Sequence, residues 1–117
     1  MAARALRGAA FGSRRRGLSA LLGDGWWGAL YDESRRNKVV AKSDKAEVNK
    51  VLKRGEWNEY VIRCEGKRLR ASLNGYQTFD YTEPDDAIPQ FGIIGLQVHG
   101  GGKTEAWYKD IMIEELP

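Results

Sequence analysis

Residues 57–81, WNEYVIRCEGKRLRASLNGYQTFDY, constrain the fold more than any other part of the chain. Apolar and polar side chains alternate on either side of Gly66, which is the period of β-strands with one buried face. Asn74-Gly75 follows the second run, and this pair tolerates the positive φ angles of a tight type I′ hairpin turn. The segment therefore predicts a meander of three antiparallel strands, with turns at Gly66 and at Asn74-Gly75.

A short helix is predicted immediately before this meander. Asp44 followed by Glu47 forms a capping-box pattern, and the apolar residues that come next share one helical face. Gly55 marks the end of this pattern. We therefore expect a helix near 45–53, preceded by a short strand that begins at Lys38.

The order of several segments resembles a known family. The meander, IPQFGIIGLQVHGG at 88–101, EAWYKDIMIEEL at 105–116 and GDGWWGALYDESRR at 23–36 together resemble the C-terminal half of the 3-keto-disaccharide hydrolase family. That family has a concanavalin-like jelly-roll domain that acts on sugars oxidised at C3. The resemblance implies an all-β, antiparallel, concanavalin-like sandwich, here truncated, with one short helix. We expect this partial domain to occupy residues 23–117.

Residues 1–22 have a different composition from the rest of the chain. They carry five arginines and no acid, and the remainder holds 14 basic against 16 acidic residues. We predict a basic, disordered extension, because large apolar groups are few. An arginine-rich, acid-free start also imitates a mitochondrial transit peptide, whereas the apolar run 17–22 is too short for a secretory signal. The compartment therefore stays open, although the resemblance implies a secreted or periplasmic protein.

Composition also limits the partners. The near-neutral body of the chain gives no electrostatic footprint for nucleic acid, and no run approaches the ~20 apolar residues of a membrane helix. We expect neither partner. The resemblance implies a carbohydrate ligand, a 3-keto-glycoside. The uncovered strand edges of a truncated sandwich favour self-association.

We expect no metal ion and no cofactor. His99 is the only histidine, so zinc-ligand spacing is missing, and the chain has no Asp-x-Asp-x-Asp calcium loop. Cys64 is the only cysteine, which excludes an intrachain disulfide. Its phase in the strand predicts a small buried hydrophobe.

Two places offer candidate chemistry. His99 follows an apolar strand and precedes three glycines, and histidine exchanges protons near neutral pH. The second place is YDESRR at 31–36, whose carboxylates and guanidiniums suit sugar hydroxyls. Adjacent residues on an extended chain face opposite sides, so only one residue of each charged pair can reach a shared site. We favour Glu33 and Arg35, on the same side as Tyr31, and predict that they meet His99 at one rim of the sheet.

The resemblance implies a glycoside hydrolase-like enzyme that acts on 3-keto-disaccharides. His99 and Glu33 would carry out the proton transfers, and Arg35 or Gln97 would hold the keto oxygen. Tyr31 would also contact the sugar. The candidates for sugar stacking are Trp26, Trp27 and Trp107. One residue of Trp26-Trp27 must point away from the core, and we assign Trp27 to substrate binding. Two alternatives stay open: a non-catalytic carbohydrate-binding sandwich module, or an inactive truncated remnant.

Overall fold

The computed structural model describes residues 2–5, 9–12, 17–22, 26–33, 36–89, 95–98 and 105–117. The strands and the helix, in chain order, are β1 (Ala2–Ala5), β2 (Ala9–Gly12), β3 (Gly17–Leu22), β4 (Leu30–Glu33), β5 (Lys38–Ala41), α1 (Lys45–Val51), β6 (Asn58–Glu65), β7 (Arg68–Leu73), β8 (Tyr76–Thr82), β9 (Gly95–Val98) and β10 (Ala106–Lys109).

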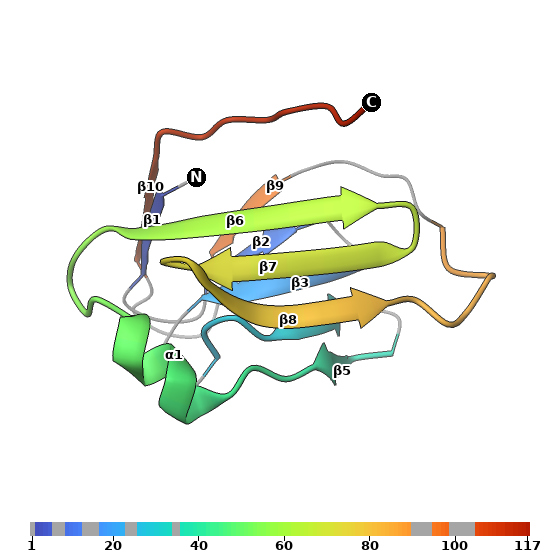
Figure 1. The fold of residues 1–117 in the computed structure, drawn as a ribbon, viewed down its shortest axis with the longest axis horizontal. Helices are drawn as coiled ribbons and strands as arrows, with labels where there is room; N and C mark the ends of the chain where they lie inside the picture. Colours follow the sequence, from blue (N-terminus) through green and yellow to red (C-terminus); the bar gives the residue numbers. More distant parts are fainter. Residues whose placement is uncertain are drawn as a thin grey trace.

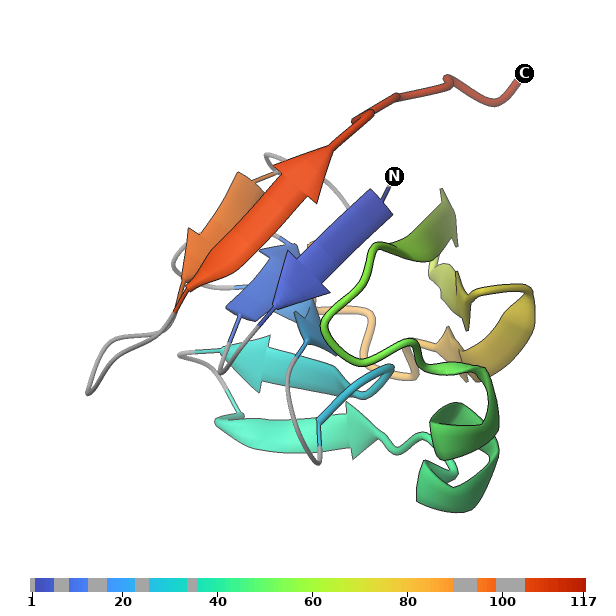
Figure 2. The same ribbon diagram turned by 90° about the vertical axis from the view of Figure 1, so that its left-hand side faces the viewer.

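Two antiparallel sheets face each other. The first has the strand order β10-β1-β6-β7-β8, and the second has the order β5-β4-β3-β2-β9. Figure 1 shows β6–β8 in front of the second sheet, and Figure 2 shows the two layers from the side, with α1 at one end. The predicted all-β antiparallel sandwich with one short helix is therefore confirmed. The jelly-roll topology stays a prediction.

The N-terminal residues take part in both sheets, which differs from the predicted disordered extension. β1 pairs with β10 and with the start of β6, and β2 pairs with both β3 and β9. Strand formation depends more on the neighbouring strand than on intrinsic preference. A segment such as Ala9–Gly12, which is alanine and glycine apart from Phe11, can therefore be held in a sheet by long-range pairing, which composition alone does not reveal.

The predicted meander is present with both of its turns. Gly66 has φ +57°, and Asn74 and Gly75 have φ angles of 49° and 87°, as a type I′ turn requires. Burial along β6 fades towards its C-terminal end, and Cys64 is exposed. The prediction of a buried Cys64 was wrong. Cys64 alternates in phase with Tyr60 and Ile62, as predicted, but it lies beyond the end of the core, where the inward-facing side of the strand is no longer covered.

The core lies between the two sheets and is closed at one end by α1. Leu30 and Leu73 come from opposite sheets and are 1% and 0% exposed, and Val48 of α1 packs beside them. Asp44 caps the helix by accepting from the backbone N–H groups of Ala46 and Glu47. The predicted Asp44 cap is confirmed, whereas the Glu47 carboxylate of the predicted capping box accepts from Lys50 at 2.7 Å. The helix ends two residues earlier than predicted.

A tight contact between the sheets fixes the start of β4. Gly28 has φ +78°, and a Cβ atom there would lie 2.5 Å from the Cβ of Thr78. Thr78 sits in β8 where the register with β7 shifts, and both Thr78 and Phe79 are buried. Such a bulge turns two successive side chains inward. Only glycine fits opposite it, because both the backbone angle and the available space exclude a side chain.

Buried amides join the helix to the meander. The Asn58 side chain is buried, accepts from Lys53 N–H at 2.8 Å and donates to Lys53 C=O at 2.9 Å. Asn74 donates to Asn58 Oδ1 at 2.8 Å and to the Val51 carbonyl at 2.8 Å. The hairpin turn therefore also satisfies a carbonyl at the C-terminal end of α1.

Candidate functional site

Two charged residues of segment 31–36 that we did not assign to the site, Asp32 and Arg36, point into the interior. Leu30 and Asp32 are buried at 1% and 0% exposure, whereas Tyr31 on the other face is half-buried. Because Leu30 must enter the core, Asp32 follows it inward. The Glu33 side chain lies outside the described residues, so its role stays a prediction.

Asp32, Arg36, Tyr81 and Glu83 form an interior group that we call the Arg36 cluster. Arg36 Nε donates to Asp32 Oδ2, and its two terminal nitrogens donate to the Glu83 carboxylate at 3.0 and 2.7 Å. The side chains of both acids are fully buried, and that of Arg36 is 25% exposed. Asp32 belongs to β4 of one sheet and Glu83 follows β8 of the other, so this guanidinium links the two layers.

The hydrogen bonds of the cluster keep Glu83 ionised. Arg36 lowers the pKa of the Glu83 carboxyl, and Glu83 in turn raises the pKa of Arg36. Tyr81 Oη donates to Glu83 at 3.2 Å, Asp85 N–H donates to it at 3.1 Å, and burial raises the pKa of Tyr81. A carboxylate with this many donors is a poor proton acceptor. The cluster is therefore suited to holding the sheets together rather than to acid–base chemistry.

Sequence reasoning did not assign Glu83 to this group. The only signal was the density of acids in TEPDD at 82–86, which we interpreted as an ordered loop. A pair separated by 47 positions, such as Arg36 and Glu83, is not visible in local spacing.

The strand register separates the two predicted catalytic positions. His99 itself lies outside the described residues, but Val98 before it lies level, through β2, with Leu22 of β3. Glu33 pairs with Gly17 at the opposite end of β3. The two positions are five residues apart along the strands and three strand spacings apart across the sheet. At about 3.4 Å per residue and about 4.8 Å per strand spacing, Val98 and Glu33 are about 22 Å apart. The predicted meeting of His99 with the 31–36 segment stays untested, and this register does not favour it.

The other predicted contacts are placed as follows. Gln97 lies within β9, with its side chain outside the described residues, as is all of Arg35. Trp27 is buried at 6% exposure, whereas Trp26 is 50% exposed. One of the two does point away from the core, but it is Trp26. Trp27 belongs to the core and cannot offer its ring to a sugar without opening it.

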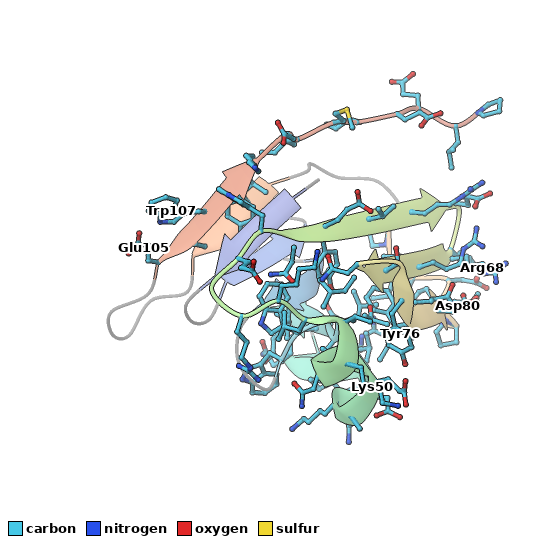
Figure 3. All side chains as sticks on the ribbon, turned by 60° about the vertical axis from the view of Figure 1, so that its left-hand side comes forward. Lys50, Arg68, Tyr76, Asp80, Glu105 and Trp107 are labelled. Atoms are coloured by element: carbon cyan, nitrogen blue, oxygen red, sulfur yellow. The ribbon has the colours of Figure 1, made fainter. Side chains whose placement is uncertain are left out.

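The outer face of β6–β8 presents polar side chains on a flat surface. A shallow depression of about 160 Å³ is lined by Val61, Arg63, Arg70, Ala71, Ser72 and Gln77. Arg63 and Arg70 both donate to Glu65, at 2.5 and 2.6 Å. Figure 3 shows Arg68 beside Asp80 at the edge of this face, and Arg68 binds the carboxylate with both ends of its guanidinium, at 2.9 and 2.6 Å.

This outer face can contact hydroxyl groups. Guanidinium and amide groups supply planar donors, and Gln77 and Ser72 supply acceptors. The depression is smaller than the about 300–1,000 Å³ of most ligand pockets. It is therefore an open contact surface rather than an enclosed reaction chamber.

A protein-family model matches most of the chain. The model of the 3-keto-alpha-glucoside-1,2-lyase-like domain covers residues 12–114. The chain belongs to this family. Membership confirms the resemblance inferred from the sequence, and the match begins at residue 12, upstream of the predicted boundary at 23. The family also supports carbohydrate as the class of ligand. No curated protein matched the chain.

The described part of the chain holds neither a cluster of metal ligands nor a membrane-spanning helix. No group of three or more His, Cys, Asp or Glu side chains there could hold a metal ion. None of the helices in that part is long and apolar enough to span a bilayer.

Proposed function

We propose that this chain cleaves α-glycosides whose sugar ring carries a ketone at C3. The observation that carries the proposal is the match to the 3-keto-alpha-glucoside-1,2-lyase-like family over residues 12–114. The polar outer face of β6–β8, with Arg63, Arg70 and Gln77, adds a surface that suits sugar hydroxyls.

The chemistry follows from the ketone. A carbonyl at C3 acidifies the proton on C2, so a base can remove it and leave the electron pair in an enolate. Collapse of the enolate forms the C1=C2 double bond and expels the C1 oxygen substituent, which takes up a proton. Addition of water across C1=C2 would then complete a net hydrolysis. The protein must supply a base, an acid and a donor to the C3 oxygen.

His99 and Glu33 remain our candidates for the acid and base, with Arg35 or Gln97 at the keto oxygen and Tyr31 against the sugar. His99 is the only imidazole of the chain, and the carboxylate of Glu83 is occupied by Arg36. The strand register separates Glu33 from Val98, whereas the C2 proton and the C1 oxygen of one sugar are neighbours. We therefore propose His99 and Glu33 as alternative candidates for a proton-transfer group at that sugar and not as a pair that acts on it together.

The expected result for His99→Gln is a fall in kcat of about 10²-fold or more on a 3-keto-α-glucoside, because general acid–base catalysis contributes that much. If Glu33 rather than His99 is the proton-transfer group, Glu33→Gln should instead lower kcat by a similar factor with an unchanged melting temperature. Glu59→Gln removes an exposed carboxylate of β6 and serves as the matched control. If His99→Gln and Glu33→Gln both retain full turnover, these residues are not the acid and base.

A carbohydrate-binding module is the second candidate function. It is favoured by one observation: the charges of the Arg36 cluster are bound to one another rather than presented to a ligand. This alternative predicts saturable sugar binding, detected by tryptophan fluorescence, without turnover of any 3-keto-glycoside.

A further inference from the structure

We infer that Trp57 and Trp107, with Glu105 and Lys109, form a second carbohydrate-binding site, a stacking platform for an uncharged pyranose ring. This inference rests on carbohydrate being the ligand class of the proposed function, but it assigns a site outside the predicted catalytic positions. Trp57 directly precedes β6, and Trp107 lies in β10. β1 runs between these two strands.

The ring of Trp107 is held in place while remaining accessible. It is 51% exposed, and Figure 3 shows it pointing outward from β10 beside Glu105. Its indole N–H donates to the Glu105 carboxylate. The ring centroids of Trp57 and Trp107 are 6.5 Å apart at a tilt of 54°, which is a favourable aromatic contact.

The same strand shows why Trp107 is not part of the core. Ala106 and Tyr108 alternate with it and pack against the core, and burial raises the pKa of Tyr108 to about 12. Glu105, Trp107 and Lys109 must therefore share the outer face. A large exposed indole that is oriented by its neighbours is a feature of binding surfaces.

The surrounding charges select the ligand. Lys109 Nζ lies over the ring of Trp57, 4.5 Å from its centroid, so Trp107 offers the open stacking face and Trp57 supports it from the side. The charge of Lys109 balances that of Glu105. These two charges give the platform no net charge of their own, which suits an uncharged sugar ring. A pyranose ring presents C–H groups on its face and hydroxyls on its rim. The indole face suits the former, and the carboxylate and the ammonium suit the latter.

The test is a titration of the full chain with maltotriose, followed through the tryptophan indole N–H resonances in NMR spectra. The Trp107 resonance should shift saturably, and mannitol, which has no ring face, should leave it unmoved. Trp107→Ala should weaken maltotriose binding by about tenfold or more, equivalent to about 1.4 kcal/mol. Trp26→Ala is the matched control, because Trp26 is equally exposed at 50%, and it should bind maltotriose as the unmodified chain does.

Several outcomes would overturn the platform. One is the absence of any maltotriose shift at Trp107, and another is an equal loss of affinity in Trp26→Ala. A third is a change in oligomeric mass on Trp107→Ala, with no change in sugar affinity, which would make the platform a protein contact. If Trp107→Ala does not fold, Trp107→Phe keeps part of the packing and should still bind maltotriose more weakly. The platform is tested by maltotriose binding, whereas the proposed function is tested by turnover of a 3-keto-α-glucoside. Either one can therefore fail while the other succeeds.

Discussion

Arg36→Met should destabilise the fold by about 3 kcal/mol. The substitution keeps the aliphatic stem but removes the charge that neutralises two buried carboxylates, Asp32 and Glu83. Breaking a buried ion pair costs about 3–5 kcal/mol, and the lower end applies because a quarter of the Arg36 side chain remains exposed to solvent. Urea unfolding at pH 7 measures the change, and the slope of the transition should stay constant.

Arg68→Met is the matched control. Arg68 also binds a carboxylate with both ends of its guanidinium, but its pair with Asp80 lies at the surface, where solvent screens the attraction. Little change in stability is expected. If the two variants are equally stable, the Arg36 cluster does not hold the sheets together.

The effect of Arg36→Met should also depend on pH. Arg36 lowers the pKa of Glu83 below its unfolded value of about 4.3, so the stabilisation is complete above that pH. It is lost as the pH falls through the lower pKa of the folded state. Without Arg36, burial would raise the pKa of Glu83. The difference in unfolding free energy between the unmodified chain and Arg36→Met should therefore be largest at neutral pH and should shrink as the pH falls towards about 4.

Gly28→Ala should cost about 2–4 kcal/mol, measured by thermal or urea unfolding. A side chain at φ +78° costs about 1–2 kcal/mol, and a methyl group 2.5 Å from the Cβ of Thr78 adds about 1–2 kcal/mol of overpacking. Gly55→Ala separates these causes, because Gly55 has φ +73° but open space around it, and only the backbone cost should appear. Thr78→Ala should not rescue Gly28→Ala fully, because it removes the clash with the γ atoms but not the backbone strain. Equal losses in Gly28→Ala and Gly55→Ala would show that the close approach of the sheets at Thr78 is unimportant.

The parts of the fold that sequence predicted are those set by local rules. The type I′ turn at Asn74-Gly75 and the Asp44 cap follow from residues within four positions of each other, and both are present. Alternation in segment 31–36 is also present, but the sequence did not show that Asp32 is the residue that enters the core, because burial of Leu30 decides it. That burial depends on the opposite sheet, and a single-residue error exchanges the two faces.

The rest depends on contacts between distant residues. β1 is held by β10 and β6, more than 50 residues away in sequence, so its composition did not reveal a strand. Likewise, Arg36 meets Glu83 only after β4 and β8 have been placed in facing sheets. Of the predicted site, the structure decides only the burial of Trp27.

The most direct test of the proposed function is the turnover of a 3-keto-α-glucoside that carries deuterium or hydrogen at C2. If the chain removes the C2 proton, the purified protein should release the C1 substituent, and the deuterated substrate should react more slowly with a normal primary isotope effect on kcat/KM. Release of the C1 substituent without an isotope effect, under conditions where the chemical step limits the rate, would indicate direct displacement at C1. No turnover of either substrate, with sugar binding intact, would contradict the enzymatic account and leave the carbohydrate-binding module.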